Sequence, residues 1–356
     1  MTEKELFLGF LATFDLTAGK INQIIDFMDG ELSISAFCKA KFDEKVLTKA
    51  VFDKMCEKAD KNRVENFLRN LENQDIVLLN KFDSRYPSKL RNLYDAPFFL
   101  FCKGDLSLLE SKGIAVVGSR KVGPYGKIVT ERFVRDLSTS SITIISGLAY
   151  GVDSIAHRKC LEMGGKTIAV LGSGFNEIYP PQHEDLAREI AEKGLLVSEY
   201  SPCHKATKFT FPLRNRIIAG LSDGVLITEA GLKSGTIHTR DYALEYGKNL
   251  YAVPGNIDSD LSSLTNDIIK SGQGALVTDA KDILDDFDMT LKTEKKAMQL
   301  SLDEQKIVSM LENGMKEADF LAKNCDLSTN LLNSCLTTLE IRGIIRRMPG
   351  GLISLD

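Results

Sequence analysis

The sequence predicts an α/β protein built on a doubly wound, mostly parallel sheet. Between residues 113 and 286, short β-branched runs such as IAVVG, ITIIS, TIAVLG and GVLITEA alternate with helix-length stretches. These runs are apolar throughout, which is typical of strands that are covered on both faces. Strands that alternate with helices in this way pair in parallel, with each helix as a crossover connection.

The flanking segments divide the chain into four parts. Residues 1–75 carry apolar residues at helical spacing, as in EKELFLGFLATF and INQIIDFM, and Thr17 stands where it can cap the second of these helices. They predict a helical domain of the SAM/HhH-like kind. Residues 76–286 form the Rossmann-like domain, which is entered through a short strand, a Tyr-Pro turn and an apolar run. Residues 287–300 are charged and predict a linker.

Residues 301–356 predict a small winged-helix-like domain. We expect three helices, the second beginning near Lys316 and the third spanning Ser328–Ile341, and then a hairpin in RGIIRRMPGGLISL with Gly-Gly in its turn. A winged helix that reads duplex DNA usually has basic residues on its third helix. Here only Arg342 ends that helix, with Arg346 and Arg347 on the wing. This favours a protein-interaction or accessory role for the domain.

Composition narrows the classes of function. The formal net charge of −4 means that any nucleic-acid site must gather its positive charge locally. Seven cysteines form no CxxC pair and no ligand spacing with the four histidines, which predicts reduced thiols, no metal site and a cytoplasmic location. The first residues have no secretion signal, and no apolar run approaches the ~20 residues of a membrane span.

Two glycine-rich motifs resemble cofactor loops, and neither has the required context. GGKT, at residues 164–167, precedes a strand, whereas a phosphate-binding P-loop follows one. LGSGFNE closes a strand and opens a helix like a dinucleotide fingerprint, but Glu177 occupies the third glycine position, where it would crowd the helix and repel a pyrophosphate. We therefore expect no cofactor.

Small residues follow many of the predicted strands. Because ligands of an open α/β sheet lie beyond the carboxyl ends of its strands, such residues allow backbone amides to approach an anion there. The six loops are Gly118-Ser119-Arg120, Ser146-Gly147, Gly172-Ser173-Gly174, Ser198-Glu199, Glu229-Ala230-Gly231 and Pro254-Gly255-Asn256.

The stretch KATKFTFPLRNR, residues 205–216, has four basic residues, no acidic residue and two phenylalanines, Phe209 and Phe211. Arginine matches phosphate with a planar fork, and an exposed aromatic ring can stack on a base, so the stretch suits single-stranded nucleic acid. The alternative is that Arg214 and Arg216 pair with Glu199 or Glu229 and that the phenylalanines are core. We expect this alternative to hold for at least one arginine and one phenylalanine.

These motifs together resemble the DNA-processing protein A (DprA, or Smf) family of bacterial DNA uptake. AVVGSRKVGPYG, ISGLAYGVDSIAHRKCLEMGGKTIAVLGSGFNEIYPPQH, LVSEYSP, KFTFPLRNRIIAGLSDGVLITEAGLKSGT and YAVPGNIDS match the family's motifs in order, over Ala115 to Gly274. The resemblance implies a non-enzymatic, cytoplasmic protein that binds and protects incoming single-stranded DNA in natural transformation. It also implies that the protein helps to load the recombinase RecA and forms a homodimer through the Rossmann-like domain.

The resemblance also indicates the DNA site. In the family's pattern, Lys208 contacts a phosphate, Phe211 stacks on a base, and Arg120, Arg214 and Asn215 lie beside them, while the glycine and serine loops meet the backbone. The complete predicted set for single-stranded DNA is Gly118, Ser119, Arg120, Ser146, Gly147, Lys208, Phe211, Arg214, Asn215 and Arg216.

Two other classes of function remain as alternatives. EAGLKSGTIHT resembles a loop of nucleotide phosphoribohydrolases of the lysine-decarboxylase-like class, but Thr239 stands where the catalytic glutamate is expected, and threonine cannot act as a carboxylate base. Asp153 and His157, four residues apart on a predicted helix, could be an acid–base pair, although such pairs are more often structural. A protein-interaction scaffold would instead show no salt-sensitive binding to single-stranded DNA.

Overall fold

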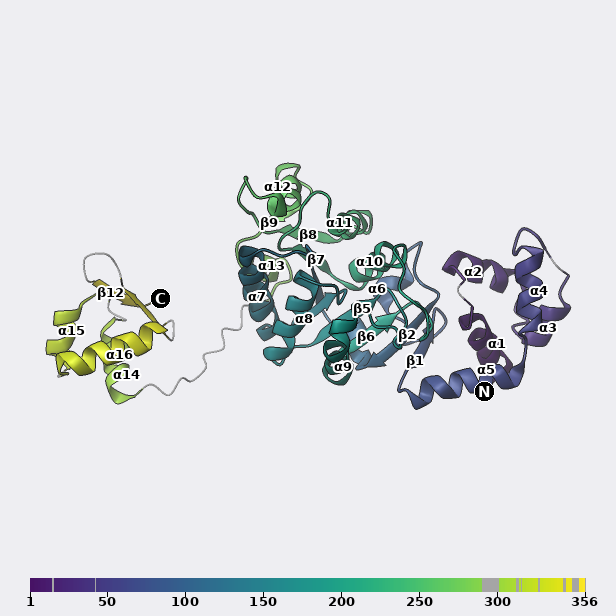
Figure 1. Cartoon of the computed structure of the whole chain (residues 1–356), viewed down its shortest axis with the longest axis horizontal. Coiled ribbons are helices and arrows are strands. Elements are labelled where there is room, and N and C mark those ends of the chain that lie inside the picture. The colour runs from purple at the N-terminus through teal and green to yellow at the C-terminus, as the bar shows by residue number, and fades with distance from the viewer. Residues whose placement is uncertain are drawn as a thin grey trace. The chain divides into compact units, whose positions relative to one another are not determined.

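The computed structural model describes residues 1–14, 16–41, 43–289, 301–311, 314, 316–325, 327–341, 344–347 and 352–355. The chain forms two compact units, Met1–Thr293 and Glu294–Asp356 (Figure 1). Residues 1–75 thus belong to the same unit as the sheet. The finer division at residues 75 and 286 stays a prediction, and residues 290–300 of the predicted linker lie outside the described residues.

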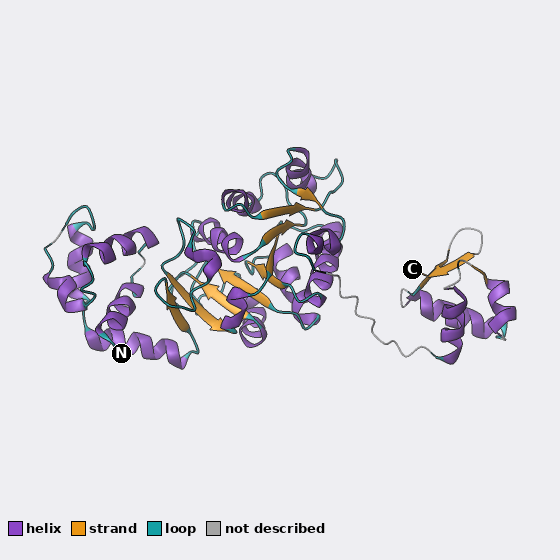
Figure 2. Cartoon of the chain, turned by 180° about the vertical axis from the view of Figure 1, so that it is seen from behind, coloured by secondary structure: helices purple, strands orange, loops and turns teal. Residues whose placement is uncertain are grey.

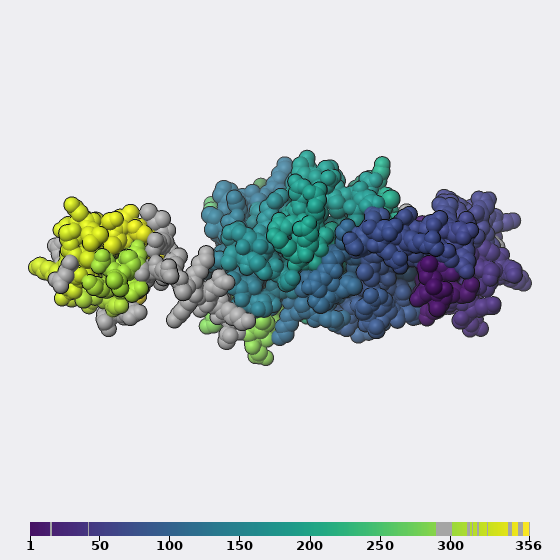
Figure 3. Space-filling view, turned by 90° about the horizontal axis from the view of Figure 1, so that it is seen from below, coloured from purple at the N-terminus to yellow at the C-terminus, as the bar shows by residue number. Residues whose placement is uncertain are grey.

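Five helices make up the first seventy-three residues, apart from the undescribed Asp15 and Phe42. They are α1 Glu3–Ala12, α2 Ala18–Phe27, α3 Ile34–Lys39, α4 Lys49–Glu57 and α5 Lys61–Asn73. The predicted cap is confirmed, because the Thr17 hydroxyl accepts a hydrogen bond from the Lys20 amide at 3.3 Å. The buried side chains of these helices share one core with Phe98, Phe99 and Phe101 of the adjoining sheet edge. Figure 3 shows the outer surface of the same helices in purple and dark blue.

Nine strands form the sheet of the first unit. They are β1 Val77–Asn80, β2 Phe99–Gly104, β3 Gly113–Val117, β4 Thr143–Ser146, β5 Thr167–Leu171, β6 Leu195–Ser198, β7 Gly224–Ile227, β8 Asn249–Ala252 and β9 Ala275–Leu276, in the order β1-β2-β6-β5-β4-β3-β7-β8-β9. In the spatial order of the sheet, every neighbouring pair from β6 through β3 to β9 is parallel. The strand β2 is antiparallel to both of its neighbours, β1 and β6. The predicted mostly parallel α/β fold is confirmed, and the segment that the sequence marked as an entry extends the same sheet.

Helices cover both faces of this sheet, as Figure 2 shows. They are α6 Ser88–Arg91, α7 Pro124–Thr139, α8 Val152–Glu162, α9 Glu184–Lys193, α10 Thr210–Leu221, α11 Thr236–Glu245, α12 Ser263–Lys270 and α13 Ala280–Asp285. Alternate side chains of β3 point to opposite faces of the sheet, so they pack against different layers of helices. Ile114 and Val116 pack with α7 and α8, and Ala115 and Val117 pack with α10 and α11.

The strand order reverses at β3. From β3 the chain runs through α7 on one face, whereas β7, which pairs with β3 on its other side, leads into α11 on the opposite face. Loops that leave neighbouring parallel strands toward opposite faces open a crevice between them. The carboxyl ends of β3 and β7 are therefore the place where this sheet can hold a ligand.

The second unit contains α14 Leu302–Leu311, β10 Lys316–Glu317, α15 Ala318–Cys325, α16 Thr329–Ile341, β11 Ile345–Arg347 and β12 Leu352–Leu355, with sheet order β10-β12-β11. Three helices and an antiparallel sheet confirm the predicted winged-helix architecture. Lys316 belongs to a strand, and the second helix begins two residues later. Arg342 and the Gly-Gly turn at residues 350–351 lie outside the described residues.

The described part of the chain has no helix that is both long enough and apolar enough to cross a membrane.

Candidate functional site

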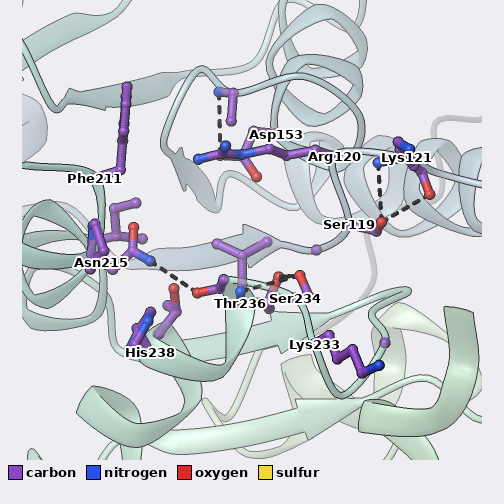
Figure 4. Close-up of a pocket in the computed structure, with 18 of the residues that line it drawn as sticks. Ser119, Arg120, Lys121, Asp153, Phe211, Asn215, Lys233, Ser234, Thr236 and His238 are labelled. Atoms are coloured by element: carbon purple, nitrogen blue, oxygen red, sulfur yellow. Dashed lines mark hydrogen bonds between the residues drawn. The ribbon is translucent and has the colours of Figure 1, made fainter. Parts of the chain in front are cut away.

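A cleft of about 1050 Å³ lies at the carboxyl ends of β3 and β7 (Figure 4). Its walls are the loop after β3, the beginning of α10, the loop from Gly231 into α11, and the turn before α12. Gly118, Ser119, Arg120, Lys208, Phe211, Arg214 and Asn215, of the predicted set, line it.

Positive charge dominates the lining. The cleft is lined by five cations, Arg120, Lys121, Lys208, Arg214 and Lys233, and by two acidic residues, Asp153 and Asp260, with His238 among them. Four of these cations, all except Arg214, are exposed, and within the described residues none of the four has an ion-pair partner. A chain of net charge −4 thus concentrates unpaired cations in one cleft, which favours an anionic ligand.

Aromatic rings meet these cations at one wall. The Arg120 guanidinium lies over the half-buried ring of Phe211, 5.4 Å from its centroid, and Figure 4 shows the Arg120 side chain extended toward that ring. The Phe209 ring is 67% exposed and lies 5.0 Å from the Lys208 ammonium. Neither phenylalanine is buried in the core, so this part of the structural alternative is wrong.

Arg216 points away from the cleft, contrary to its place in the predicted DNA-binding set. Its guanidinium donates to a Glu199 carboxylate oxygen at 2.6 Å and to the Asp95 carbonyl at 2.7 Å, and the residue is 8% exposed. The structural alternative therefore holds for Arg216, which joins α10 to the end of β6 and the loop before β2. Two residues apart on a helix, Arg214 and Arg216 face different neighbours.

Arg214 lies in the floor of the cleft and is only 3% exposed. Its guanidinium donates to the Gly147 carbonyl at 2.6 Å and to the Val170 carbonyl, which joins the ends of β4 and β5. Burial lowers the pKa of Arg214 to about 10, and the nearby Asp153 opposes this effect. Because Nη1 donates to two carbonyls inside the protein, Arg214 supports the cleft from below.

Ser146 and Gly147 lie beneath the cleft and do not line it. Ser146 is fully buried and its hydroxyl donates to the Val116 carbonyl at 2.7 Å. A Cβ at Gly147 would stand 2.6 Å from the Arg214 guanidinium carbon, so only glycine fits there. The prediction that this loop meets the ligand is therefore corrected, because both residues hold the strand ends in place.

The loop after β3 has a similar internal role in its first two residues. The Ser119 amide donates to the Glu229 carbonyl at 2.7 Å, and a Cβ at Gly118 would lie 2.6 Å from the same oxygen. The Ser119 hydroxyl exchanges hydrogen bonds with the Lys121 backbone at 2.9 and 3.1 Å. These contacts connect the loops of β3 and β7, and they fix the direction in which Arg120 and Lys121 leave.

Several cleft residues were missed from the sequence. Lys121 directly follows the predicted Gly-Ser-Arg loop, and Lys233 lies in the loop before α11, so their positions next to known strand ends were the available signal. Tyr179, which is 47% exposed, also lines the cleft, and its ring centroid is 5.3 Å from that of Phe211. Its sequence context, EIYPPQH, contains no lysine or arginine and no period that separates it from an ordinary turn.

The residues proposed for an enzyme are held by contacts inside the protein. His157 is fully buried, with Nδ1 at 2.7 Å from the Thr167 hydroxyl, and burial lowers its pKa to about 3. Asp153 accepts the Gly147 and Ala149 amides through one oxygen. Thr239 is 2% exposed. Of these three residues, His157 does not line the cleft, whereas Asp153 and Thr239 belong to its lining.

Comparison with known proteins gives matches in both units of the chain. Residues 77–288 match the family described as DNA recombination-mediator protein A, and residues 292–351 match the DprA winged helix domain. The DNA processing protein DprA of Streptococcus pneumoniae is 43% identical over 206 residues, which cover 58% of this chain and 72% of that protein. Protein Smf of Escherichia coli is 37% identical over 303 residues, covering 82% and 81% of the two chains.

Solved structures give the same result. The crystal structure of DNA processing protein A from Streptococcus pneumoniae aligns with a TM-score of 0.68 at 34% identity, over 80% of this chain and 98% of that one. DNA processing protein A from Helicobacter pylori, whose structure concerns its single-stranded DNA binding mode, aligns with a TM-score of 0.55 at 32% identity, over 60% and 97%. The family match over residues 77–288 alone covers more than half of the chain. The chain therefore belongs to the DNA recombination-mediator protein A family, also called DprA or Smf.

Proposed function

We propose that this chain binds single-stranded DNA in the cleft between the β3 and β7 loops. The observation that carries the proposal is a group of four exposed cations, Arg120, Lys121, Lys208 and Lys233, which have no ion-pair partner among the described residues and line the cleft together with the half-buried Phe211 ring. Phosphates of a strand satisfy the cations, and an unpaired base can stack on an aromatic ring. The single-stranded DNA binding of the Helicobacter pylori relative supports this assignment.

The cleft favours a single strand over a duplex. A duplex keeps its bases stacked inside, so an aromatic ring gains nothing from it without unstacking. Readers of the major groove present an exposed helix or ribbon, whereas most of α10 from Arg214 onward is buried against the sheet. At this end of α10, Lys208, which precedes the helix, and Phe211, in its first turn, reach the cleft.

We further propose that the chain acts as a recombination mediator, as its family name describes, with a RecA-type recombinase as its partner. Protection of incoming DNA in natural transformation, a homodimer through the Rossmann-like domain, and a cytoplasmic location stay predictions from the sequence. In this role the protein changes no covalent bond, and the cleft has to hold the strand and release it.

Binding measured by fluorescence anisotropy tests the proposal. Single- and double-stranded oligonucleotides of one sequence are titrated at two salt concentrations, with Arg188→Ala as a control variant, because Arg188 is exposed on α9 and does not line the cleft. We expect preference for the single strand and a steep loss of affinity with salt through counterion release. Equal binding to both forms, or binding that ignores salt, contradicts the proposal.

A further inference from the structure

We propose that Tyr179 is a second stacking residue of this cleft, which binds the base next to the one on Phe211. The inference rests on the proposed function, since it extends the same single-stranded DNA site by one nucleotide. Tyr179 lies in the turn between β5 and α9, a part of the chain that no charge or aromatic pattern marks as a ligand site.

The first step is the state of the Phe211 ring. Arg120 covers one part of it from 5.4 Å, and Gly172 approaches it so closely that a Cβ there would stand 3.0 Å from the ring carbon Cδ1. Phe211 alone therefore offers only a small ring surface on which a base can stack. Tyr179 enlarges it, because the two ring centroids are 5.3 Å apart with planes inclined by 49°.

The second step is exposure. Tyr179 is 47% exposed although it touches Phe211, and within the described residues its hydroxyl has no hydrogen-bond partner. A buried tyrosine normally pairs its hydroxyl, and a core tyrosine would hide its ring. Tyr179 instead presents ring surface to the cleft beside the cations of Arg120 and Lys208. Successive bases of a single strand stack on successive aromatic rings beside such a charged groove.

The third step is that the turn holds Tyr179 in place. Pro180 is buried, and its carbonyl accepts the His183 amide at 2.9 Å. The buried His183 ring in turn bonds the Leu148 carbonyl at 2.8 Å, which ties the turn to the loop after β4. A rigid tyrosine offers contact area while losing little side-chain freedom on binding.

The remaining alternative is that Tyr179 only positions Phe211. Double-mutant analysis separates the two roles, because a residue that acts through Phe211 has no effect once Phe211 is alanine, whereas an independent contact keeps its effect. The proposal predicts that the effects of Tyr179→Ala and Phe211→Ala on affinity multiply. Loss of the Tyr179→Ala effect in the Phe211→Ala background overturns it.

The single variants are measured first, by anisotropy with an oligothymidine at fixed salt. We expect Tyr179→Ala to weaken binding roughly 5- to 150-fold, which corresponds to about 1–3 kcal/mol for one stacked base, with an unchanged salt slope. Tyr179→Phe keeps the ring and should bind within about twofold of the wild type. Tyr94→Ala is the matched control, because Tyr94 is 74% exposed in the same unit but does not line the cleft.

A spectroscopic experiment observes the contact directly. The chain contains no tryptophan, so Tyr179→Trp introduces a single reporter at the proposed contact. Saturating oligothymidine should quench its emission, and the same duplex concentration should not. Unchanged emission on binding overturns the proposal, and this variant keeps the aromatic ring should Tyr179→Ala fail to fold.

The outcomes separate this inference from the proposed function. Wild-type protein that binds no single-stranded DNA removes both. Wild-type protein that binds, with a Tyr179→Ala variant of equal affinity, removes the role of Tyr179 and leaves the function standing.

Discussion

Lys208 and Phe211 lie three residues apart at the beginning of α10, and the structure gives them different chemistry. Lys208 is an exposed ammonium close to an exposed ring, whereas Phe211 is a half-buried ring beneath a guanidinium. A phosphate contact depends on counterion release and a stacking contact does not. Salt therefore distinguishes the two residues.

Lys208→Ala should weaken binding equally across sequences and reduce the salt slope by about 0.7, the value for one phosphate contact on a single strand. Phe211→Ala should cost about 1–3 kcal/mol of binding with nearly the same slope, because no charge is lost. Affinity at several salt concentrations and the melting temperature are measured on the same samples. Normal binding by Lys208→Ala together with unfolding of Phe211→Ala would show that the stretch is structural.

Arg216 represents the opposite case, a cation whose partner is internal. Removing it leaves the partly buried Glu199 carboxylate, which its guanidinium contacts at 2.6 Å, without its counterion. Breaking one side of a buried pair typically costs about 3–5 kcal/mol. We expect Arg216→Ala to lower the unfolding free energy by about that amount in urea titrations.

The control for this prediction is the apolar double variant Arg216→Met with Glu199→Leu. Replacing both partners removes the unpaired charge, so this variant should be more stable than Arg216→Ala. If Arg216→Ala keeps wild-type stability and loses DNA binding, Arg216 contacts the ligand, and its contacts with Glu199 and Asp95 do not stabilise the fold.

At the scale of elements, α8 is joined to β5 through a buried imidazole. His157 Nδ1 lies 2.7 Å from the Thr167 hydroxyl, and burial, aided by Arg214 and His183, lowers the pKa of His157 to about 3 from an ordinary 6.5. In the unfolded chain, His157 therefore binds a proton near pH 6.5, whereas in the folded protein it stays neutral at that pH. Stability is complete above pH 6.5 and decreases as the pH falls toward 3.

The test is the pH dependence of unfolding between pH 7 and 5, above the range where most carboxylates titrate. For the wild type we expect a loss of about 2 kcal/mol from His157 over this interval. The glutamine of His157→Gln cannot titrate. Over the same interval, the unfolding free energy of this variant should therefore fall by about 2 kcal/mol less than that of the wild type. An identical pH dependence of the two proteins would mean that the imidazole is hydrated and not desolvated.

Elements with a strong local pattern could be predicted from the sequence. Apolar runs bounded by glycine located β3 to β8, and helical spacing located the N-terminal helices. The antiparallel extension by β1 and β2 was missed, because the pairing of β2 with β6 joins residues almost a hundred positions apart and leaves no local trace. Propensity describes a strand and says nothing about its neighbour.

The site shows the same limit. The sequence could place small residues after six strands, but only the reversal of strand order at β3 decides which loops open into a cleft. Ser146 and Gly147 are small residues like Gly118 and Ser119, yet they lie beneath the cleft. Likewise, the helical phase of α10 decides that Arg214 faces the floor and Arg216 faces Glu199.

At the scale of the whole molecule, net charge and binding charge are separate properties. The chain is acidic overall, yet the exposed cations of the cleft stand together without acidic partners among the described residues. Every residue that lines the cleft belongs to the first compact unit. The C-terminal unit has its own core, built from α14, α15 and α16 with β11 and β12.

Because the C-terminal unit has a hydrophobic core of its own, we expect the two units to fold and function independently. Deletion of residues 294–356 removes a complete winged-helix unit and no cleft residue. The described exposed residues of α16 are neutral except for Glu340, so this helix has no basic face for a duplex. We expect the shortened protein to melt at the same temperature, to bind single-stranded DNA within about twofold of the full chain, and to keep the same salt slope.

Anisotropy titrations of both proteins with single- and double-stranded oligonucleotides, at two salt concentrations, check this prediction. The salt slope is the informative quantity, because it counts the phosphates that a protein neutralises, about 0.7 per contact on a single strand. A shortened protein that melts normally but has a smaller slope has lost phosphate contacts, which places Arg346 and Arg347 of the wing on the DNA. An unchanged slope assigns all of the strand's contacts to the cleft and leaves the winged helix free for a protein partner.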